Sequence, residues 1–133
     1  MAFGTATVLT SVGKGITAKR MLGATPSQAE PKYLGIGTGA TGAARTAAIG
    51  DTALSTEVEA RSGANAGTTV TTTVTNDTYQ VIQAITAGGT RAVDEAGLFD
   101  AATSGNMFIS ATFPVVTLLA GDSLQVTATC QYT

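Results

Sequence analysis

The sequence predicts an all-β fold: an antiparallel β-sandwich, jelly-roll-like, with about eight strands and an extended N-terminal arm. Apolar residues alternate with polar ones along most of the chain, a period of two that is typical of half-buried strands. Turn residues separate these runs at short intervals, which is typical of sandwiches and barrels. Threonine and β-branched residues are frequent, and they favour an extended backbone. We expect residues 1–31 to form the arm and residues 32–133 the sandwich domain.

The first strands are expected in "FGTATVLT" (residues 3–10) and "KYLGIG" (residues 32–37). The glycine- and alanine-rich residues 35–50 and the segment 62–68 are expected to be loops. The runs "TTVTTTVT" (residues 68–75) and "YQVIQAIT" (residues 79–86) flank Asn76 and Asp77, two turn residues, so they predict a β-hairpin.

The C-terminal half continues with short alternating runs: "EAGLFD", "MFISATF", a break at Pro114, "VVTLLAGD" and "SLQVTATCQY". Two of these runs place apolar side chains on one face, and these two stripes predict the core. The stripes are Met107, Ile109, Ala111 and Phe113, and Leu124, Val126, Ala128, Cys130 and Tyr132.

Composition limits the classes of function. The 133 residues include 7 basic and 9 acidic residues and carry a net charge of −2, which argues against direct nucleic-acid binding because that affinity comes from neutralising phosphates. Residues 1–31 carry Lys14, Lys19 and Arg20 against Glu30, whereas the remainder has four basic and eight acidic residues. Aromatic residues make up only 5% and there is no Trp, so the core is thin and we expect an oligomer.

The sequence lacks the usual groups of a catalytic centre. It has no His and a single cysteine, Cys130, which removes Ser-His-Asp and Cys-His arrangements and histidine-based zinc sites. The acids Asp51, Glu57 and Glu59 lack the dense spacing of a Ca²⁺ loop, and the neighbours Asp94 and Glu95 are expected on opposite faces of a strand. We therefore expect no enzyme activity, no metal and no cofactor.

Residues Gly37, Gly39 and Gly42 have the G-x-G-x-x-G spacing of a dinucleotide-binding turn. That motif needs a buried strand, a parallel sheet and a helix that opens at the pyrophosphate. Period-two hairpins follow here instead, so the glycines are interpreted as a surface crossing where a neighbouring backbone can approach closely. The chain also lacks a long apolar run and a signal-peptide pattern, and we expect a soluble protein made in the cytoplasm, with no membrane partner.

Four segments, in this order, carry a family resemblance: "PKYLGIGTGATGAARTAAIGDTALSTEVEAR", "TTTVTNDTYQVIQAIT", "AVDEAGLFDAATSGNMFISATFP" and "LLAGDSLQVTATC". Together they resemble small structural proteins of tailed bacteriophages, most of all the head decoration (cement) proteins. The resemblance extends from Pro31 to about Thr129 and departs at Ile36, where the family pattern has an aromatic residue.

The resemblance implies a homotrimer that binds the major capsid protein on the outer surface of the virion and stabilises the shell. One alternative is a tail-fibre or baseplate adaptor, which some relatives are named as; a second is a small enzyme, disfavoured by the missing His. Nine residues are candidates for capsid or subunit contacts, in the arm, the glycine loop and the "EAGLFD" strand: Lys14, Lys19, Arg20, Tyr33, Gly37, Gly39, Gly42, Leu98 and Phe99. Of Leu98 and Phe99, one is expected in the core and the other at an interface.

Overall fold

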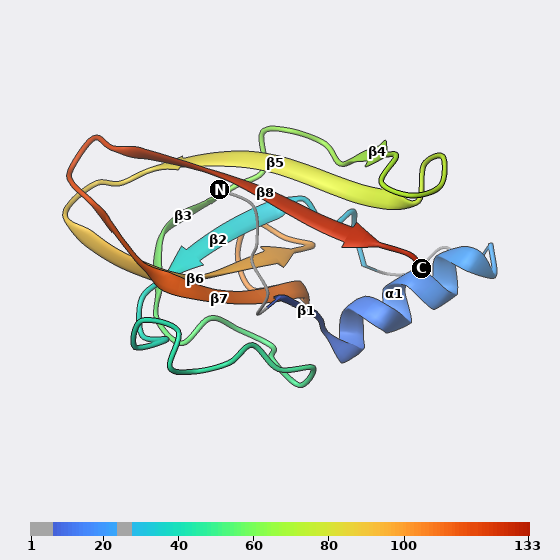
Figure 1. Ribbon diagram of the computed structural model, residues 1–133, viewed down its shortest axis with the longest axis horizontal. Helices are drawn as coiled ribbons and strands as arrows, with labels where there is room; N and C mark the ends of the chain where they lie inside the picture. Colours follow the sequence, from blue (N-terminus) through green and yellow to red (C-terminus); the bar gives the residue numbers. More distant parts are fainter. Residues whose placement is uncertain (1–6, 24–27) are drawn as a thin grey trace.

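The computed structural model describes residues 7–23 and 28–133. It contains two antiparallel β-sheets packed face to face and one helix at their end (Figure 1). In chain order the elements are β1 (Thr7–Leu9), α1 (Ser11–Met21), β2 (Tyr33–Gly37), β3 (Glu57–Ser62), β4 (Thr68–Val70), β5 (Thr78–Thr86), β6 (Arg91–Phe99), β7 (Met107–Leu118) and β8 (Ser123–Gln131). The predicted β-sandwich of about eight strands is therefore confirmed.

The strand order is β1-β7-β6-β2-β3 in the larger sheet and β4-β5-β8 in the smaller one. The pairs β2–β3, β4–β5 and β6–β7 join successive strands within one sheet. The predicted hairpin is the β4–β5 pair, in which Thr69 lies opposite Tyr79. Its first strand is shorter than predicted, because β4 ends at Val70 and residues 71–77 form the connection. Strands β5 and β8 pair without interruption from Thr78–Gln131 to Thr86–Ser123.

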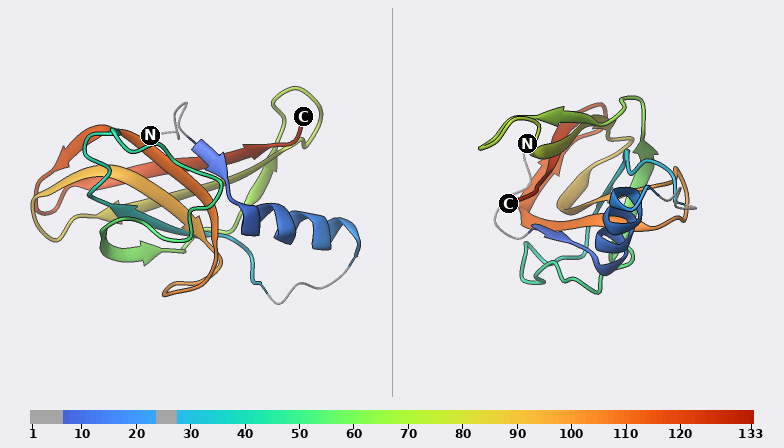
Figure 2. Two further views of the ribbon diagram at one scale, coloured as in Figure 1. Left: turned by 90° about the horizontal axis from the view of Figure 1, so that it is seen from below. Right: turned by 90° about the vertical axis from the view of Figure 1, so that its right-hand side faces the viewer.

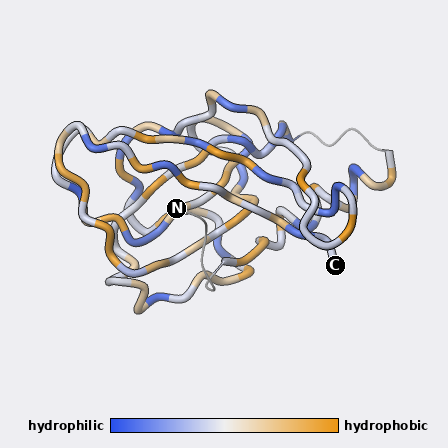
Figure 3. The backbone as a smooth tube through the Cα atoms, turned by 45° about the horizontal axis from the view of Figure 1, so that its top comes forward, coloured by the Kyte–Doolittle hydropathy of each residue, from blue (hydrophilic) through white to orange (hydrophobic). Residues whose placement is uncertain are grey.

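The main core lies between the two sheets and follows the predicted stripes. Ile109 and Phe113 of β7 and Leu124, Val126 and Ala128 of β8 lie in this core. Met107 and Ala111 of the β7 stripe are also buried, but Met107 packs in a second, smaller cluster. At the end of β8 the stripe leaves the core, because Cys130 is half-buried and Tyr132 is exposed. Hydrophobic and hydrophilic segments alternate along the chain (Figure 3).

Residues 93–99 of β6 and 107–113 of β7 are buried on both faces, because residues 38–56 cross the outer face of the larger sheet (Figure 2, left). Leu54 from this connection forms a second small cluster with Phe99, Met107 and Tyr33. A strand that is covered on both sides reads as a nearly continuous apolar run, as "AGLF" and "MFISATF" do.

The N-terminal segment differs from the expected extended arm because it contains α1. Thr10 caps this helix by accepting a hydrogen bond of 3.1 Å from Gly13 N–H. Gly13 allows close packing, since a Cβ there would lie 2.6 Å from the Phe108 carbonyl oxygen, and Ile16 is buried in the core. Two glycines in eleven residues are unfavourable for a helix, so packing against β7 is what stabilises it.

Candidate functional site

A groove of about 790 Å³ lies at the end of the sandwich where α1 is attached. Its lining comes from α1 on one side and from the end of the smaller sheet with Tyr132 on the other; Figure 2 shows α1 at this end of the sandwich. The lining is largely apolar and comes from segments far apart in the sequence: Ile16, Thr17, Arg20, Met21, Glu30, Pro31, Thr69, Asn76, Tyr79, Phe108 and Tyr132.

The inner part of the groove is built around Tyr79. Its ring meets Phe108 edge to face, with 6.1 Å between ring centroids, and its hydroxyl donates to the Pro31 carbonyl oxygen at 3.1 Å. The Glu30 carboxylate accepts from Gly67 N–H at 2.6 Å and lies 3.4 Å from the Tyr79 hydroxyl. Burial and the charge of Glu30 raise the pKa of Tyr79, so the phenol stays protonated and acts as a fixed donor.

Apolar side chains are exposed around the groove. Met21 and Leu22, at the end of α1, are 83% and 84% exposed. Val74 and Tyr132 are exposed too: Val74 belongs to the β4–β5 connection, of which Asn76 lines the groove, and the Tyr132 hydroxyl lies 3.3 Å from that of Thr17 on α1. We call α1, the groove and these exposed residues the α1 end. Clustered exposed apolar side chains with polar neighbours are typical of surfaces that contact another protein.

Basic charge also gathers at the α1 end. Arg45, Arg61 and Arg91 each form an ion pair within the sandwich, with Glu95, Glu57 and Glu59 respectively. In the part of the chain that the structure describes, the four remaining basic residues form no ion pair. Lys14, Lys19 and Arg20 lie on α1, and Lys32 lies just before β2.

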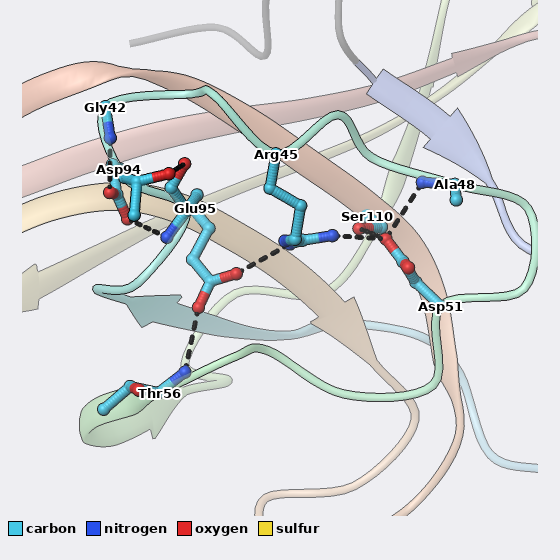
Figure 4. Close-up of polar contacts among 10 residues, drawn as sticks. Gly42, Arg45, Ala48, Asp51, Thr56, Asp94, Glu95 and Ser110 are labelled. Carbon is cyan, nitrogen blue, oxygen red and sulfur yellow. Dashed lines mark hydrogen bonds and ion pairs between the residues drawn. The ribbon is translucent and has the colours of Figure 1, made fainter.

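The glycine-rich connection after β2 does not form a nucleotide site. Gly39 and Gly42 adopt positive φ values of 114° and 70°, and the chain turns back across the larger sheet without entering a helix. The Asp94 carboxylate accepts from Ala40 N–H at 3.0 Å and from Gly42 N–H at 2.9 Å (Figure 4). The backbone donors that a phosphate would need are thus bound to a carboxylate of the protein itself.

A buried ionic network fixes the rest of this connection (Figure 4). Glu95 is fully buried; it binds Arg45 Nη2 at 2.7 Å and accepts from Thr56 N–H at 3.1 Å. Arg45 Nη1 reaches Asp51 at 3.0 Å. Burial of Asp51 opposes its ionisation, but hydrogen bonds from Ala48 N–H, Ser110 and Arg45 outweigh it and lower the pKa of this carboxyl. These groups hold a loop in place and leave no carboxylate free for chemistry.

The expectation that Asp94 and Glu95 face opposite sides of the sheet is wrong. The β6–β7 register shifts between Val93 and Glu95, and a bulge of this kind redirects side chains. Both carboxylates therefore reach the connection formed by residues 38–56. Among residues 7–23 and 28–133, no group of three or more His, Cys, Asp or Glu side chains is placed to hold a metal ion, nor is any helix long and apolar enough to cross a membrane.

The structure places the nine candidate contact residues in three different environments. Lys14, Lys19 and Arg20 are exposed on α1, and Arg20 lines the groove. Gly37 is buried at the end of β2, where a Cβ would lie 2.6 Å from Glu95 Oε1, while Gly39 and Gly42 are exposed in the connection that follows.

The other three candidates pack within the chain. Leu98 and Phe99 lie in different clusters, as alternation predicts, but both are fully buried, so the expectation that one of them lies at an interface is not met in this chain. Phe99 is covered by Tyr33 and by the Arg61 guanidinium, which lies 3.4 Å from the ring centroid. The groove residues Tyr79 and Phe108 were not singled out from the sequence, because their pattern there is that of ordinary strand residues.

Comparison of the chain with protein-family models, with curated proteins and with solved structures found no match. Its function is therefore inferred from the residues and the geometry described above.

Proposed function

We propose that this protein is a structural component of a tailed-bacteriophage virion: a decoration (cement) protein that binds the major capsid protein on the outer surface of the head as a homotrimer and stabilises the shell. The observation that carries the proposal is the α1 end. There the apolar groove and the side chains of Met21 and Leu22 are open to solvent, whereas Arg45, Arg61 and Arg91 of the sandwich are each bound to a carboxylate of the chain. The order of the four sequence segments supplies the phage context.

The placement of the acidic residues supports a binding role over a catalytic one. Every one of the nine carboxylates accepts a hydrogen bond inside the chain: Glu30, Asp51, Glu57, Glu59, Asp77, Asp94, Glu95, Asp100 and Asp122. A general acid or base must be able to reach a substrate proton, and these groups are already engaged with the protein.

A small rigid sandwich also suits repetitive attachment. Its connections are fixed by side-chain hydrogen bonds to the backbone, as with Asp77, which accepts from the N–H groups of Thr72, Thr73 and Val74. Many such units, each bound weakly to a symmetric lattice, add up to firm attachment when they are linked as trimers.

The proposal is tested by mixing the purified protein with expanded phage heads that lack it, counting bound copies by quantitative gel and heating the heads. We expect saturation at hundreds of copies and survival of the heads at higher temperature. Light scattering of the free protein should give the mass of a trimer. A few copies at one vertex would identify a tail or baseplate component instead, and no binding to any particle would reject a virion role.

A further inference from the structure

We propose that the α1 end is a docking site for an acidic segment of another protein, with an apolar side chain of that segment seated in the groove. The placing of this partner in the phage shell rests on the proposed function. The chemistry of the site is argued from the structure alone. Three observations lead to it: the groove, the exposed pair Met21 and Leu22, and the unmatched basic residues on α1.

The apolar part of the site is open in this chain. The groove has a volume of about 790 Å³ and an aromatic inner wall formed by Tyr79 and Phe108. Its size and lining suit one or two large apolar side chains, which are the usual anchors of an interface. Met21 lines the groove, and its neighbour Leu22 is exposed, so both add to the apolar surface that a partner in the groove would meet.

The charge of the site selects an acidic partner. Helix α1 has three basic residues and no acidic one. Lys14, Lys19 and Arg20 form no ion pair among the described residues; Arg20 Nη2 lies 3.4 Å from the Gln28 carbonyl oxygen. Arg20 lines the groove, and Lys14 and Lys19 are exposed on the same helix. Basic side chains near an apolar patch raise the association rate with acidic surfaces and repel basic ones.

A second copy of this chain is a poor occupant for the same reason. All nine of its side-chain carboxylates are bonded internally, four of them in ion pairs with Arg45, Arg61 and Arg91. Recruiting one of them to the α1 end of a neighbour would break a bond that already exists. The positive charge on α1 is therefore complemented by a different protein with free Asp or Glu side chains.

The first test uses a probe that does not involve phage particles. The probe is a fluorescein-labelled amphipathic peptide of about 15 residues with Leu and Phe on one face and Asp and Glu on the other; its control has Lys at every acidic position. Fluorescence anisotropy should show saturable binding of the acidic peptide that weakens with salt, and at least about tenfold weaker binding of the basic peptide.

Two variants of the protein locate the site. The first is a triple variant with Lys14→Gln, Lys19→Gln and Arg20→Gln, which should bind the acidic peptide about tenfold more weakly than the wild type. The second, Met21→Ser with Leu22→Ser, should also bind the peptide about tenfold more weakly. These side chains are exposed, so thermal unfolding should change little in either variant.

A matched control changes the net charge by the same amount at the opposite end of the sandwich. This triple variant carries Thr86→Glu, Thr90→Glu and Ala120→Glu, at exposed positions near the β5–β6 and β7–β8 turns (Figure 1). Its affinity for the acidic peptide should lie within about twofold of that of the wild type. Equal weakening in this control would mean that net charge, and not the α1 end, governs binding, and it would overturn the proposal.

Repeating the measurements on expanded heads separates the two proposals. Peptide binding without head binding leaves the docking site standing and rejects the decoration role. If both α1 variants bind heads as fully as the wild type and the protein does not bind the peptide, the docking site is rejected and the decoration role is left intact. Loss of both kinds of binding in the α1 variants alone supports both proposals.

Discussion

Replacing Arg45 by Met should destabilise this protein strongly, although Arg45 lies on a connection outside the β-sheets. The change removes the partner of Glu95, a carboxylate with no exposed surface that is held by Arg45 Nη2 at 2.7 Å and by Thr56 N–H at 3.1 Å. It also removes the 3.0 Å contact between Arg45 and Asp51. A buried charge then remains with a single backbone donor.

The size of the effect follows from burial. Breaking a fully buried ion pair costs about 3–5 kcal/mol, but the Arg45 side chain is 30% exposed, and water screens part of the interaction. We therefore expect the free energy of unfolding to fall by about 2–3 kcal/mol. For a domain of this length, that corresponds to a decrease in Tm of about 6–10 °C.

Urea unfolding of the wild type, Arg45→Met, Glu95→Gln and the double variant measures this directly. The Gln side chain can still accept from Thr56 N–H but carries no charge, so Glu95→Gln should cost much less in the Arg45→Met background than in the wild type. The coupling energy should be at least about 1 kcal/mol. A loss below about 0.5 kcal/mol in Arg45→Met, or additive effects in the double variant, would refute the assignment of a buried, coupled pair.

Three further changes probe other parts of the structure. Gly37→Ala places a Cβ 2.6 Å from Glu95 Oε1 and should lower the free energy of unfolding by about 1–3 kcal/mol. Gly15 on α1 has open space around it, so Gly15→Ala should raise the free energy of unfolding by about 0.5–1 kcal/mol. Urea unfolding shows whether each variant is less or more stable than the wild type. Thr10→Ala removes the cap of α1 and should cost about 1–2 kcal/mol, seen as lower Tm and faster amide exchange in the helix. Asp77 has its pKa lowered, chiefly by the backbone N–H groups of the turn it closes, so its stabilisation is complete above the unfolded pKa and disappears as pH falls below about 4. The difference in Tm between wild type and Asp77→Asn should therefore be present at pH 7 and vanish in strong acid; a constant difference would contradict this.

Much of the sandwich could be predicted from local sequence. The alternation in "SLQVTATC" places Leu124, Val126 and Ala128 on one face, and all three are buried in the structure. The turn residues Asn76 and Asp77 mark the β4–β5 hairpin. These features depend on residues a few positions apart, so a short window of sequence contains them.

The candidate site was predicted only in part. Lys14, Lys19 and Arg20 were singled out by their charge, and they do lie at the α1 end. The helix itself was not expected, because Gly13 and Gly15 reduce helix propensity and the packing that offsets them comes from Phe108, far along the chain.

The sequence by itself determined the strand pattern, the hairpin and the lack of histidine chemistry, because each is a property of composition or of neighbouring residues. Only the tertiary structure decided how both faces of β6 are covered and where the groove forms. Asp94 binds Gly42 across 52 positions and Glu95 binds Arg45 across 50, and the groove joins α1 to Tyr132 at the other end of the chain. Such contacts depend on how the sheets and connections pack in space, which no local period encodes.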